Sequence, residues 1–325
     1  MFRRYAFLLL VILTINFILP RAMRSDPFLY LSSDADETSA YSKEQIVQYR
    51  AYYGLDRPLW RQYLSYLQGF ARGDLGQSIY YRKPVSELIL GRLPWTVGIV
   101  LSGLLLGISG GVLLGSLSAW NAGGRFDRAL YRFMVAGSQV PAFVTGIVVL
   151  LLFAVAIPGL PLSGGRSPFA SLEFDLHSLA DVARHAVLPV MTLTLVRLPD
   201  FFLTSRSAML HEIRAAYVLT ARAKGLGTPT ILFGHCLRNA ANPIMTRALL
   251  SLANTFGGAL VVENVFKYPG VGTLIREAVF QRDYILMQGA FMAITILTLS
   301  VNGFAELFYS RRSGRFRNPK GRSVP

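Results

Sequence analysis

The sequence has 325 residues but only one cysteine and four histidines. The lone Cys236 excludes an intramolecular disulfide and a cysteine-rich metal site. The histidines are scattered along the chain, at His177, His185, His211 and His235, and predict no metal cluster. No G-x-x-x-x-G-K-[ST] motif is present, so the chain lacks the phosphate-binding loop of nucleotide hydrolases. Cofactor fingerprints and catalytic carboxylate pairs are also missing. We therefore expect a chain that binds no cofactor or metal and is not itself an enzyme.

Charge is scarce as well, since 16% of residues are charged while 52% are hydrophobic. With a mean hydropathy of +0.41, this composition is too apolar for an ordinary soluble protein and predicts several membrane spans. The formal net charge of +15 would suit a nucleic-acid partner. However, the positive charges are distributed among loops, and no RNA- or DNA-binding motif accompanies them. The composition therefore predicts contact with membrane lipid and none with nucleic acid.

Six apolar stretches divide the chain, and we interpret them as an all-α integral membrane fold with six transmembrane helices. These stretches are residues 5–20, 95–119, 133–157, 185–204, 244–262 and 285–308. The first follows a basic start, as a secretory signal peptide would, but Arg21, Met23 and Arg24 occupy the region where cleavage would occur. We therefore expect residues 1–20 to be retained as the first transmembrane helix, with a cleaved signal peptide as the alternative.

The predicted organisation follows from these spans and from the charges between them. Residues 21–94 form an external segment, and residues 95–310 form a five-helix core with a cytoplasmic loop at 205–242. Residues 311–325 form a basic tail. With a cytoplasmic amino terminus, the inside segments carry a net charge of about +13 and the outside segments about +1, which agrees with the positive-inside rule. Both termini are thus predicted to be cytoplasmic.

The span at residues 95–119 carries a glycine every four residues. These glycines, Gly103, Gly107, Gly111 and Gly115, predict close packing against another helix. The same run contains a G-x-S-x-G pattern around Ser109, which would suit an intramembrane serine protease. That chemistry needs a base beside the serine, and no histidine lies within the core of a predicted span. The packing role is therefore favoured over the protease.

Several polar residues interrupt the predicted spans. Arg197 and Asp200 lie three residues apart, so they can pair on one face of a helix. Gln139 precedes Pro141 in the third span, and Asn254 lies in the fifth. Intramembrane polar groups are costly and usually face an interior or a water-filled path. We therefore leave two readings open for these residues, a structural ion pair and a lining of the substrate path.

The stretch Glu212–Pro243 is the longest polar interval after residue 120. Ile213, Tyr217 and Ala221 recur at helical spacing, and Gly225 can adopt a positive φ that ends a helix. Thr228 and Pro229 then suit the start of a second helix. The pattern predicts a helix, a sharp turn and another helix, although a solvated loop without a special role would also carry these charges.

The run YVLTARAKGL at Tyr217–Leu226, followed by HCLRNA at His235–Ala240 and then Pro243, resembles the cytoplasmic EAA loop of ABC-importer permeases. The likeness is strongest to the B-type subunit of the oligopeptide/dipeptide branch. Residues 54–60, 73–78, 263–272 and 282–284 resemble the same branch. Leu219-Thr220-Ala221 stands for the EAA triplet, so the glutamate is absent, as is usual in this branch. Arg197 and Asp200 stand where the family usually has small or apolar residues.

The resemblance implies a type I (MetI-like) permease fold with a small external domain after helix 1. It implies a cell (inner) membrane permease, bacterial or archaeal, that imports di- or oligopeptides, nickel or another small solute. Its partners would be a second permease subunit in a heterodimer, an external substrate-binding protein and two cytoplasmic ABC ATPases that carry ATP and Mg. The ATPase-coupling residues would be Tyr217, Thr220, Ala221, Arg222, Ala223, Lys224, Gly225 and Leu226. An ion-coupled secondary transporter is the alternative, although the sequence shows no inverted repeat.

Overall fold

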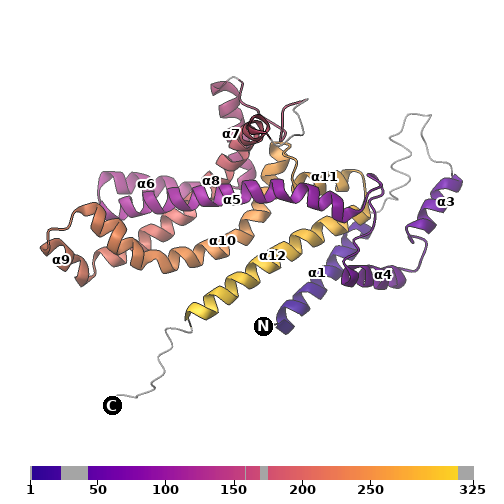
Figure 1. The fold of residues 1–325 in the computed structure, drawn as a ribbon, viewed down its shortest axis with the longest axis horizontal. Helices are drawn as coiled ribbons and strands as arrows, with labels where there is room; N and C mark the ends of the chain where they lie inside the picture. The colour runs from indigo at the N-terminus through magenta and orange to yellow at the C-terminus, as the bar shows by residue number, and fades with distance from the viewer. Residues whose placement is uncertain (1, 23–42, 158, 169–174, 314–325) are drawn as a thin grey trace, which may run out of the picture. The chain divides into compact units, whose positions relative to one another are not determined.

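The computed structural model of the chain describes residues 2–22, 43–157, 159–168 and 175–313, and in these ranges the regular structure is helical apart from one isolated bridge, Gln77–Pro84 (Figure 1). The predicted all-α architecture is confirmed. Part of the predicted external segment, residues 23–42, and most of the predicted basic tail lie outside the described residues. The helices are α1 (Phe2–Ala22), α3 (Lys43–Tyr52), α4 (Leu59–Arg72), α5 (Val85–Trp120), α6 (Arg125–Gly137), α7 (Ala142–Ala156), α8 (Leu176–Ile213), α9 (Ala216–Ala223), η1 (Thr230–Cys236), α10 (Leu237–Val265), α11 (Val271–Phe280) and α12 (Tyr284–Ser313).

Three of the described helices are long and apolar enough to cross a membrane by themselves: α5, α8 and the part of α12 at Tyr284–Leu307. Two bent pairs raise the number to five if each pair is counted as one span. In α1 the apolar part, Phe7–Arg21, is shorter than these helices. The count of six spans therefore stays a prediction.

Two of these helices extend well beyond the apolar stretches that predicted them. Helix α5 begins at Val85 and α8 at Leu176, whereas apolarity placed their starts at residues 95 and 185. The side chain of Asp175 accepts a hydrogen bond from the Ser178 backbone N–H (2.8 Å) and so caps the start of α8. Apolarity indicates the part of a helix that suits lipid, and the charged turns beyond it are helical too.

The third predicted span, residues 133–157, contains a sharp bend between two helices. Ser138–Pro141 is the expected interruption of this span, and α6 and α7 meet at 110° around a break at residues 138–141. Pro141 caps α7, where its lack of an N–H costs no hydrogen bond, and it disfavours a helical conformation at Val140. The interruption lies where it was predicted, and at Pro141 the chain forms two helices instead of one bent helix.

The chain divides into two compact units, which we describe separately. The N-terminal unit comprises residues 1–95 and 269–297, and the core unit comprises residues 96–268 and 298–325. In the N-terminal unit, the buried carboxylate of Asp283 accepts hydrogen bonds from the Ser78 hydroxyl and from the backbone N–H groups of Tyr80 (3.0 Å) and Leu286 (2.9 Å). This carboxylate caps α12 and fastens the loop that precedes α5.

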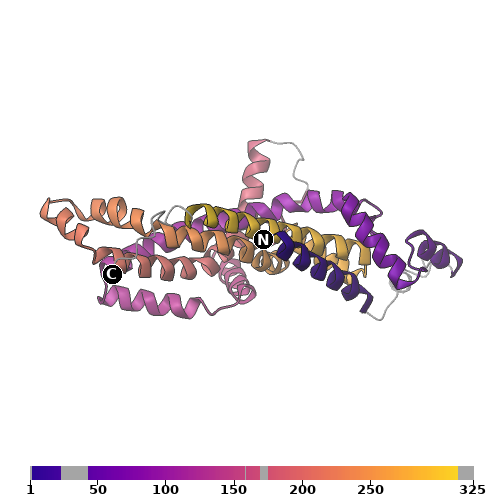
Figure 2. The same cartoon turned by 90° about the horizontal axis from the view of Figure 1, so that it is seen from below.

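The core unit is built on α8. Helices α8 and α10 run side by side, and α6 and α7 also pack on α8 (Figure 1 and Figure 2). The glycine stripe of α5 lies against α8, and a Cβ atom built on each glycine would meet an atom of α8 at 2.6 to 3.0 Å. Gly111 is the tightest case, since its Cβ would lie 2.6 Å from Phe201 Cβ and 2.8 Å from the Leu198 carbonyl oxygen. The two backbones approach closely because α5 presents no side chain along this line.

We expect Gly111→Val to lower the thermal unfolding midpoint of the purified chain strongly. The new side chain would meet backbone atoms of α8 that cannot rotate away, and overpacking typically costs about 1–3 kcal/mol. Gly98→Val is the matched control, because a Cβ on Gly98 of the same helix meets nothing within 4 Å. Equal midpoints for the two variants would contradict the close approach of α5 and α8.

Candidate functional site

The predicted helix, turn and helix are present in the basic stretch after α8. Helix α9 ends with Lys224 as its C-cap, and Gly225 has a φ of +74°. The chain becomes helical again at Thr228 and continues as the π-helical turn η1. One feature was not predicted: the chain leaves helical geometry at Arg214–Ala215, which separates α8 from α9. Neither residue is a helix breaker, so no sequence pattern signals this break.

One face of α9 is fixed to the core unit. Val218 and Ala221 are 2% and 8% exposed, and they belong to an apolar cluster with Met209 of α8 and Ile231 and Cys236 of η1. This spacing of three residues brings both side chains onto the buried face. Helix α9 therefore holds a defined position although it has only eight residues.

Two polar contacts add to this apolar attachment. The Tyr217 hydroxyl donates a hydrogen bond to Glu212 Oε2 (2.6 Å), and the Arg222 guanidinium lies 5.0 Å from the centre of the Trp120 ring. Burial and the hydrogen bond to Glu212 raise the pKa of Tyr217 well above its ordinary value. Tyr217 therefore stays a neutral donor at any physiological pH, and the contact to Glu212 persists.

The other face of α9 is exposed. Leu219 is 74% exposed, and Thr220, Ala223 and Lys224 beside it are exposed as well. Leu226, in the following turn, is 38% exposed. Helix α9 lies at one end of the core unit, where α8 ends and α10 begins (Figure 1). Helix α9 is thus packed on the core unit by one face and exposes leucine side chains beside basic residues on the other, a form that suits insertion into a partner. Leu219 was missed as a single residue of interest, although it belongs to the predicted run.

The structure brings three of the four polar span residues together. Arg197 Nη1 lies 3.6 Å from Asp200 Oδ2, and Arg197 Nη2 donates a hydrogen bond to the Asn254 carbonyl oxygen (2.9 Å). Arg247 of α10 joins them, with its Nη2 atom 3.2 Å from Asp200 Oδ1. The contact of Arg247 with Asp200 was not predicted, because nothing in the sequence pairs Arg247 with α8. Gln139 lies instead in the break between α6 and α7, where its amide donates to the Ser138 hydroxyl (3.1 Å).

A separate ion pair, in which the carboxylate is buried, was not predicted. The carboxylate of Asp127 in α6 is 2% exposed and accepts hydrogen bonds from Arg206 Nε (2.7 Å) and Nη2 (2.8 Å). It also accepts from the Ser118 hydroxyl and from the Gly123 backbone N–H (2.9 Å). Asp127 thus connects α5, the turn after it, α6 and α8 through one carboxylate. Because these contacts hold four segments together, we assign Asp127 to the framework of the core unit.

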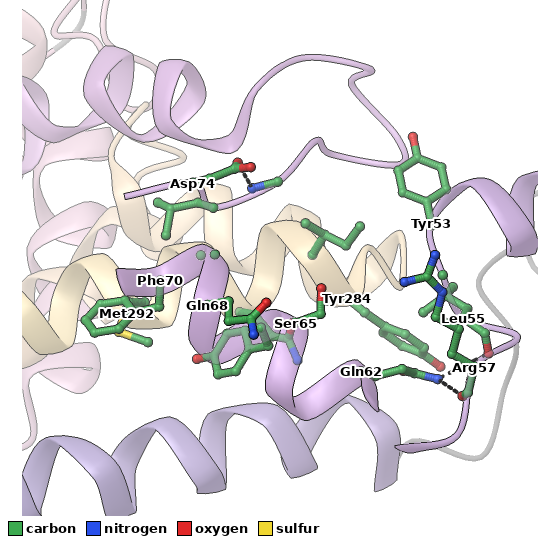
Figure 3. Close-up of a pocket in the computed structure, with 18 of the residues that line it drawn as sticks. Tyr53, Leu55, Arg57, Gln62, Ser65, Gln68, Phe70, Asp74, Tyr284 and Met292 are labelled. Carbon is green, nitrogen blue, oxygen red and sulfur yellow. Dashed lines mark hydrogen bonds between the residues drawn. The ribbon is translucent and has the colours of Figure 1, made fainter. Parts of the chain in front are cut away.

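The N-terminal unit contains an open pocket of about 320 Å³, lined by polar and apolar side chains of α1, α4, α12 and the segments that flank α4. Figure 3 shows Gln62, Gln68 and Tyr284 facing this space, with the Gln62 amide donating to the Arg57 carbonyl oxygen (2.7 Å). Arg21 also lines it, but all three guanidinium nitrogens already donate within the chain, to Gln62 and Phe17. The Arg21 side chain is therefore held in place by hydrogen bonds within the N-terminal unit.

The glycines of the G-x-S-x-G pattern around Ser109 have a packing role. Gly107 and Gly111 of the G-x-S-x-G pattern both pack on α8, so the spacing of these glycines has a structural explanation without a catalytic serine. In the part of the chain that the structure describes, no three His, Cys, Asp or Glu side chains are grouped so that they could hold a metal ion.

Comparison with known proteins identifies the family. Residues 111–318 match the family model described as "Binding-protein-dependent transport system inner membrane component". The di/tripeptide transport system permease protein DppB of Pseudomonas aeruginosa is 32% identical over 280 residues, which cover 82% of this chain and 83% of that protein. The dipeptide permease DppB of Escherichia coli K12 is 30% identical over 97% of this chain and 96% of its own length. The oligopeptide permease AppB of Bacillus subtilis is 31% identical over 93% of each chain.

The fold has a solved counterpart. A chain of the inward-facing MetNI methionine ABC transporter superposes with a TM-score of 0.55 and 14% identity, covering 69% of this chain and 95% of that one. This likeness supports the expected type I permease fold of the core. The chain belongs to the family of inner membrane components of binding-protein-dependent transport systems.

Proposed function

We propose that this chain is the transmembrane permease subunit of an ATP-driven importer of di- and oligopeptides. The substrate class rests on the relatives, since the three named above are permeases for dipeptides, tripeptides or oligopeptides and align over most of this chain. The sequence has no phosphate-binding loop for ATP. ATP and Mg would therefore be bound and used by separate ATPase subunits, and this chain would hold no cofactor.

The geometry of α9 carries this proposal. A helix that is anchored by Val218 and Ala221 and that exposes Leu219 is built to transmit movement from a partner to the rest of the core unit. In this role, Leu219, Thr220, Ala223 and Leu226 make contact with the ATPase, while Arg222 and Lys224 supply positive charge. Tyr217 and Ala221 hold the helix to the core, and Gly225 forms the turn. Closure of the ATPases would push α9, and the spans would alternate between states open to either side.

The chain would work in an assembly of several subunits with a fixed orientation in the membrane. The chain would pair with a second, similar permease subunit as a heterodimer, with two cytoplasmic ATPases and an external substrate-binding protein. Residues 1–20 would be a retained span, residues 21–94 an external segment and residues 95–310 the permease core. Both termini and the 205–242 loop would then be cytoplasmic in the inner membrane. The excess of Lys and Arg on that side supports this orientation.

Copurification of the tagged chain tests the proposal. The wild-type chain should carry ATPase activity with it, and Leu219→Glu should weaken ATPase binding by roughly 30-fold, because a central apolar anchor contributes about 2 kcal/mol. Leu59→Glu on α4 is the matched control, since Leu59 is 63% exposed in the segment proposed to be external. If Leu219→Glu left ATPase binding unchanged, the proposed contact between α9 and the ATPase would be contradicted. A chain without any ATPase, whose uptake follows an ion gradient, would instead be a secondary transporter.

A further inference from the structure

The ionic cluster of α8 and α10 contains more positive than negative charge. Its members are the guanidiniums of Arg197 and Arg247 and the single carboxylate of Asp200. Two cations share one anion, so the cluster has a formal charge of +1. Charges inside membrane helices are costly unless they are paired or face a water-filled path. A second anion would remove this imbalance.

The cluster lies where three segments of the core unit meet. Gly137, at the end of α6, is close to Pro199, since a Cβ on Gly137 would lie 3.6 Å from Pro199 Cγ. A Cβ on Gly258 would lie 3.7 Å from Arg197 Nη2 and 4.0 Å from Ala142 Cβ, at the start of α7. The charges are therefore next to the 110° break between α6 and α7. Such a break is tolerated at membrane depth when it is buried in protein or lines a cavity.

Arg197 and Arg247 differ in exposure and in the hydrogen-bond donors that their contacts leave unused. Arg197 is 14% exposed and held by Asp200 and Asn254, but its buried Nε atom has no hydrogen-bond partner. Arg247 is 45% exposed, and Asp200 is 27% exposed. A guanidinium has five N–H donors in a planar fork that fits a carboxylate, and Asp200 occupies only part of the fork of Arg247. The accessible side of the cluster thus has unused donors and excess positive charge.

From this arrangement we infer that Arg197 and Arg247 form a binding site for a carboxylate group of the transported substrate. This inference rests on the proposed function, because a peptide carries a carboxylate at its C-terminus and on acidic side chains. Asp200 holds Arg247 in place when the site is empty and competes with the incoming carboxylate. This competition keeps the site weak enough to release the substrate, a need that every transport site has.

A purely structural strut between α8 and α10 is the competing explanation, and Asp200→Asn separates the two. In a strut, Asp200→Asn breaks the ion pairs to both arginines and Arg247→Gln breaks one of them, so both lower stability and neither raises the binding of a carboxylate. In a carboxylate site they have opposite effects: Arg247→Gln removes a donor, whereas Asp200→Asn removes the competing anion. Arg247→Lys, which keeps the charge, should retain most of the binding.

Direct binding can be measured with trifluoroacetate as the probe, by the broadening of its fluorine NMR signal on the purified full chain in phosphatidylcholine nanodiscs. Broadening that excess acetate reverses should fall by about tenfold in Arg247→Gln, since hydrogen bonds to charged groups are among the stronger ones. It should rise in Asp200→Asn. Arg128→Gln, an exposed arginine of α6, is the control and should change nothing. No reversible broadening in the wild type, or equal losses in Arg247→Gln and Asp200→Asn, would overturn the inference. If Asp200→Asn fails to accumulate, equal binding by Arg247→Lys and Arg247→Gln would overturn it.

Uptake by the whole transporter identifies the source of the carboxylate and tests the proposed function separately. The probes are trialanine, trialanine amide and the amide of Ala-Glu-Ala, and each variant is compared with the wild type for the same probe. Arg247→Gln should lower trialanine uptake about tenfold and leave trialanine amide uptake unchanged if the C-terminus is bound. If Arg247→Gln lowers the uptake of Ala-Glu-Ala amide by the same factor, the site also binds the carboxylates of acidic side chains. Equal losses for trialanine and its amide would overturn the inference. A wild type that takes up no peptide would overturn the proposed function, while the trifluoroacetate result would still decide the site.

Discussion

Replacement of Gly225 by valine should lower peptide uptake at least about tenfold while the chain still inserts into the membrane. Gly225 has a φ of +74°, a conformation that is a genuine outlier for a β-branched residue. A Cβ at this position meets nothing within 4 Å, so the effect would come from the backbone and not from a clash. The strain would be released by a change in the turn, and α9 would no longer be joined to the following helix in the same way.

The hydrogen bonds of this turn explain why its conformation matters. The Gly225 N–H donates to the Arg222 carbonyl (2.9 Å), and the Leu226 N–H donates to the Ala221 carbonyl (3.2 Å). These two bonds form a Schellman motif, which requires the left-handed residue that glycine provides. Without it, Leu226 and the end of α9 would lose their fixed positions, and ATP hydrolysis would continue without transport.

The measurement is the ratio of peptide uptake to ATP hydrolysis in vesicles that contain the complete transporter. Gly225→Asn should keep most of the coupling, since asparagine tolerates the left-handed conformation better than other residues. Gly227→Val is the matched control in the same turn, because Gly227 has no positive φ and its Cβ would meet only Pro229 Cδ at 3.9 Å. An unchanged ratio in Gly225→Val would mean that the turn does not take part in coupling.

Features that depend on neighbouring residues could be predicted from the sequence. The left-handed turn at Gly225, the new helix at Thr228 and the i, i+3 pair of Arg197 and Asp200 all follow from local spacing. The glycine repeat of α5 predicted a close helix contact, because a helix face without side chains lets another helix backbone approach closely in a membrane. The apolar stretches located the helices, but they missed the charged turns at both ends of α8.

Features that depend on distant residues could not be predicted in this way. Arg247 meets Asp200 only because α10 packs along α8, and no periodicity in either helix records that register. The angle between α6 and α7 could not be predicted from local sequence either. A proline can kink a helix or end it, and the surrounding packing decides between these outcomes. The contact between Asp127 and Arg206 spans 79 residues and likewise has no local pattern.

The Asp127–Arg206 pair leads to the second large effect, a loss of stability in Asp127→Asn. Asparagine keeps the size of the side chain but leaves the Arg206 guanidinium, which is only 20% exposed, without its anion. Removal of one partner from a buried ion pair typically costs about 3–5 kcal/mol, and we expect a loss near the lower end because Arg206 retains some contact with solvent. Arg206 also lies 4.8 Å from the centre of the Tyr131 ring, which offers partial compensation.

The free energy of unfolding can be measured by titrating the purified chain in mixed micelles with sodium dodecyl sulfate. The double variant Asp127→Asn/Arg206→Gln should be more stable than the sum of its single variants predicts, with a coupling energy of about 1–3 kcal/mol. Glu87→Gln is the control, because the Lys83–Glu87 pair is 60% exposed on both sides and such pairs contribute less than about 1 kcal/mol. If Asp127→Asn cost no more than Glu87→Gln, the carboxylate that joins α5, α6 and α8 would contribute no more to the stability of the core unit than an exposed ion pair does.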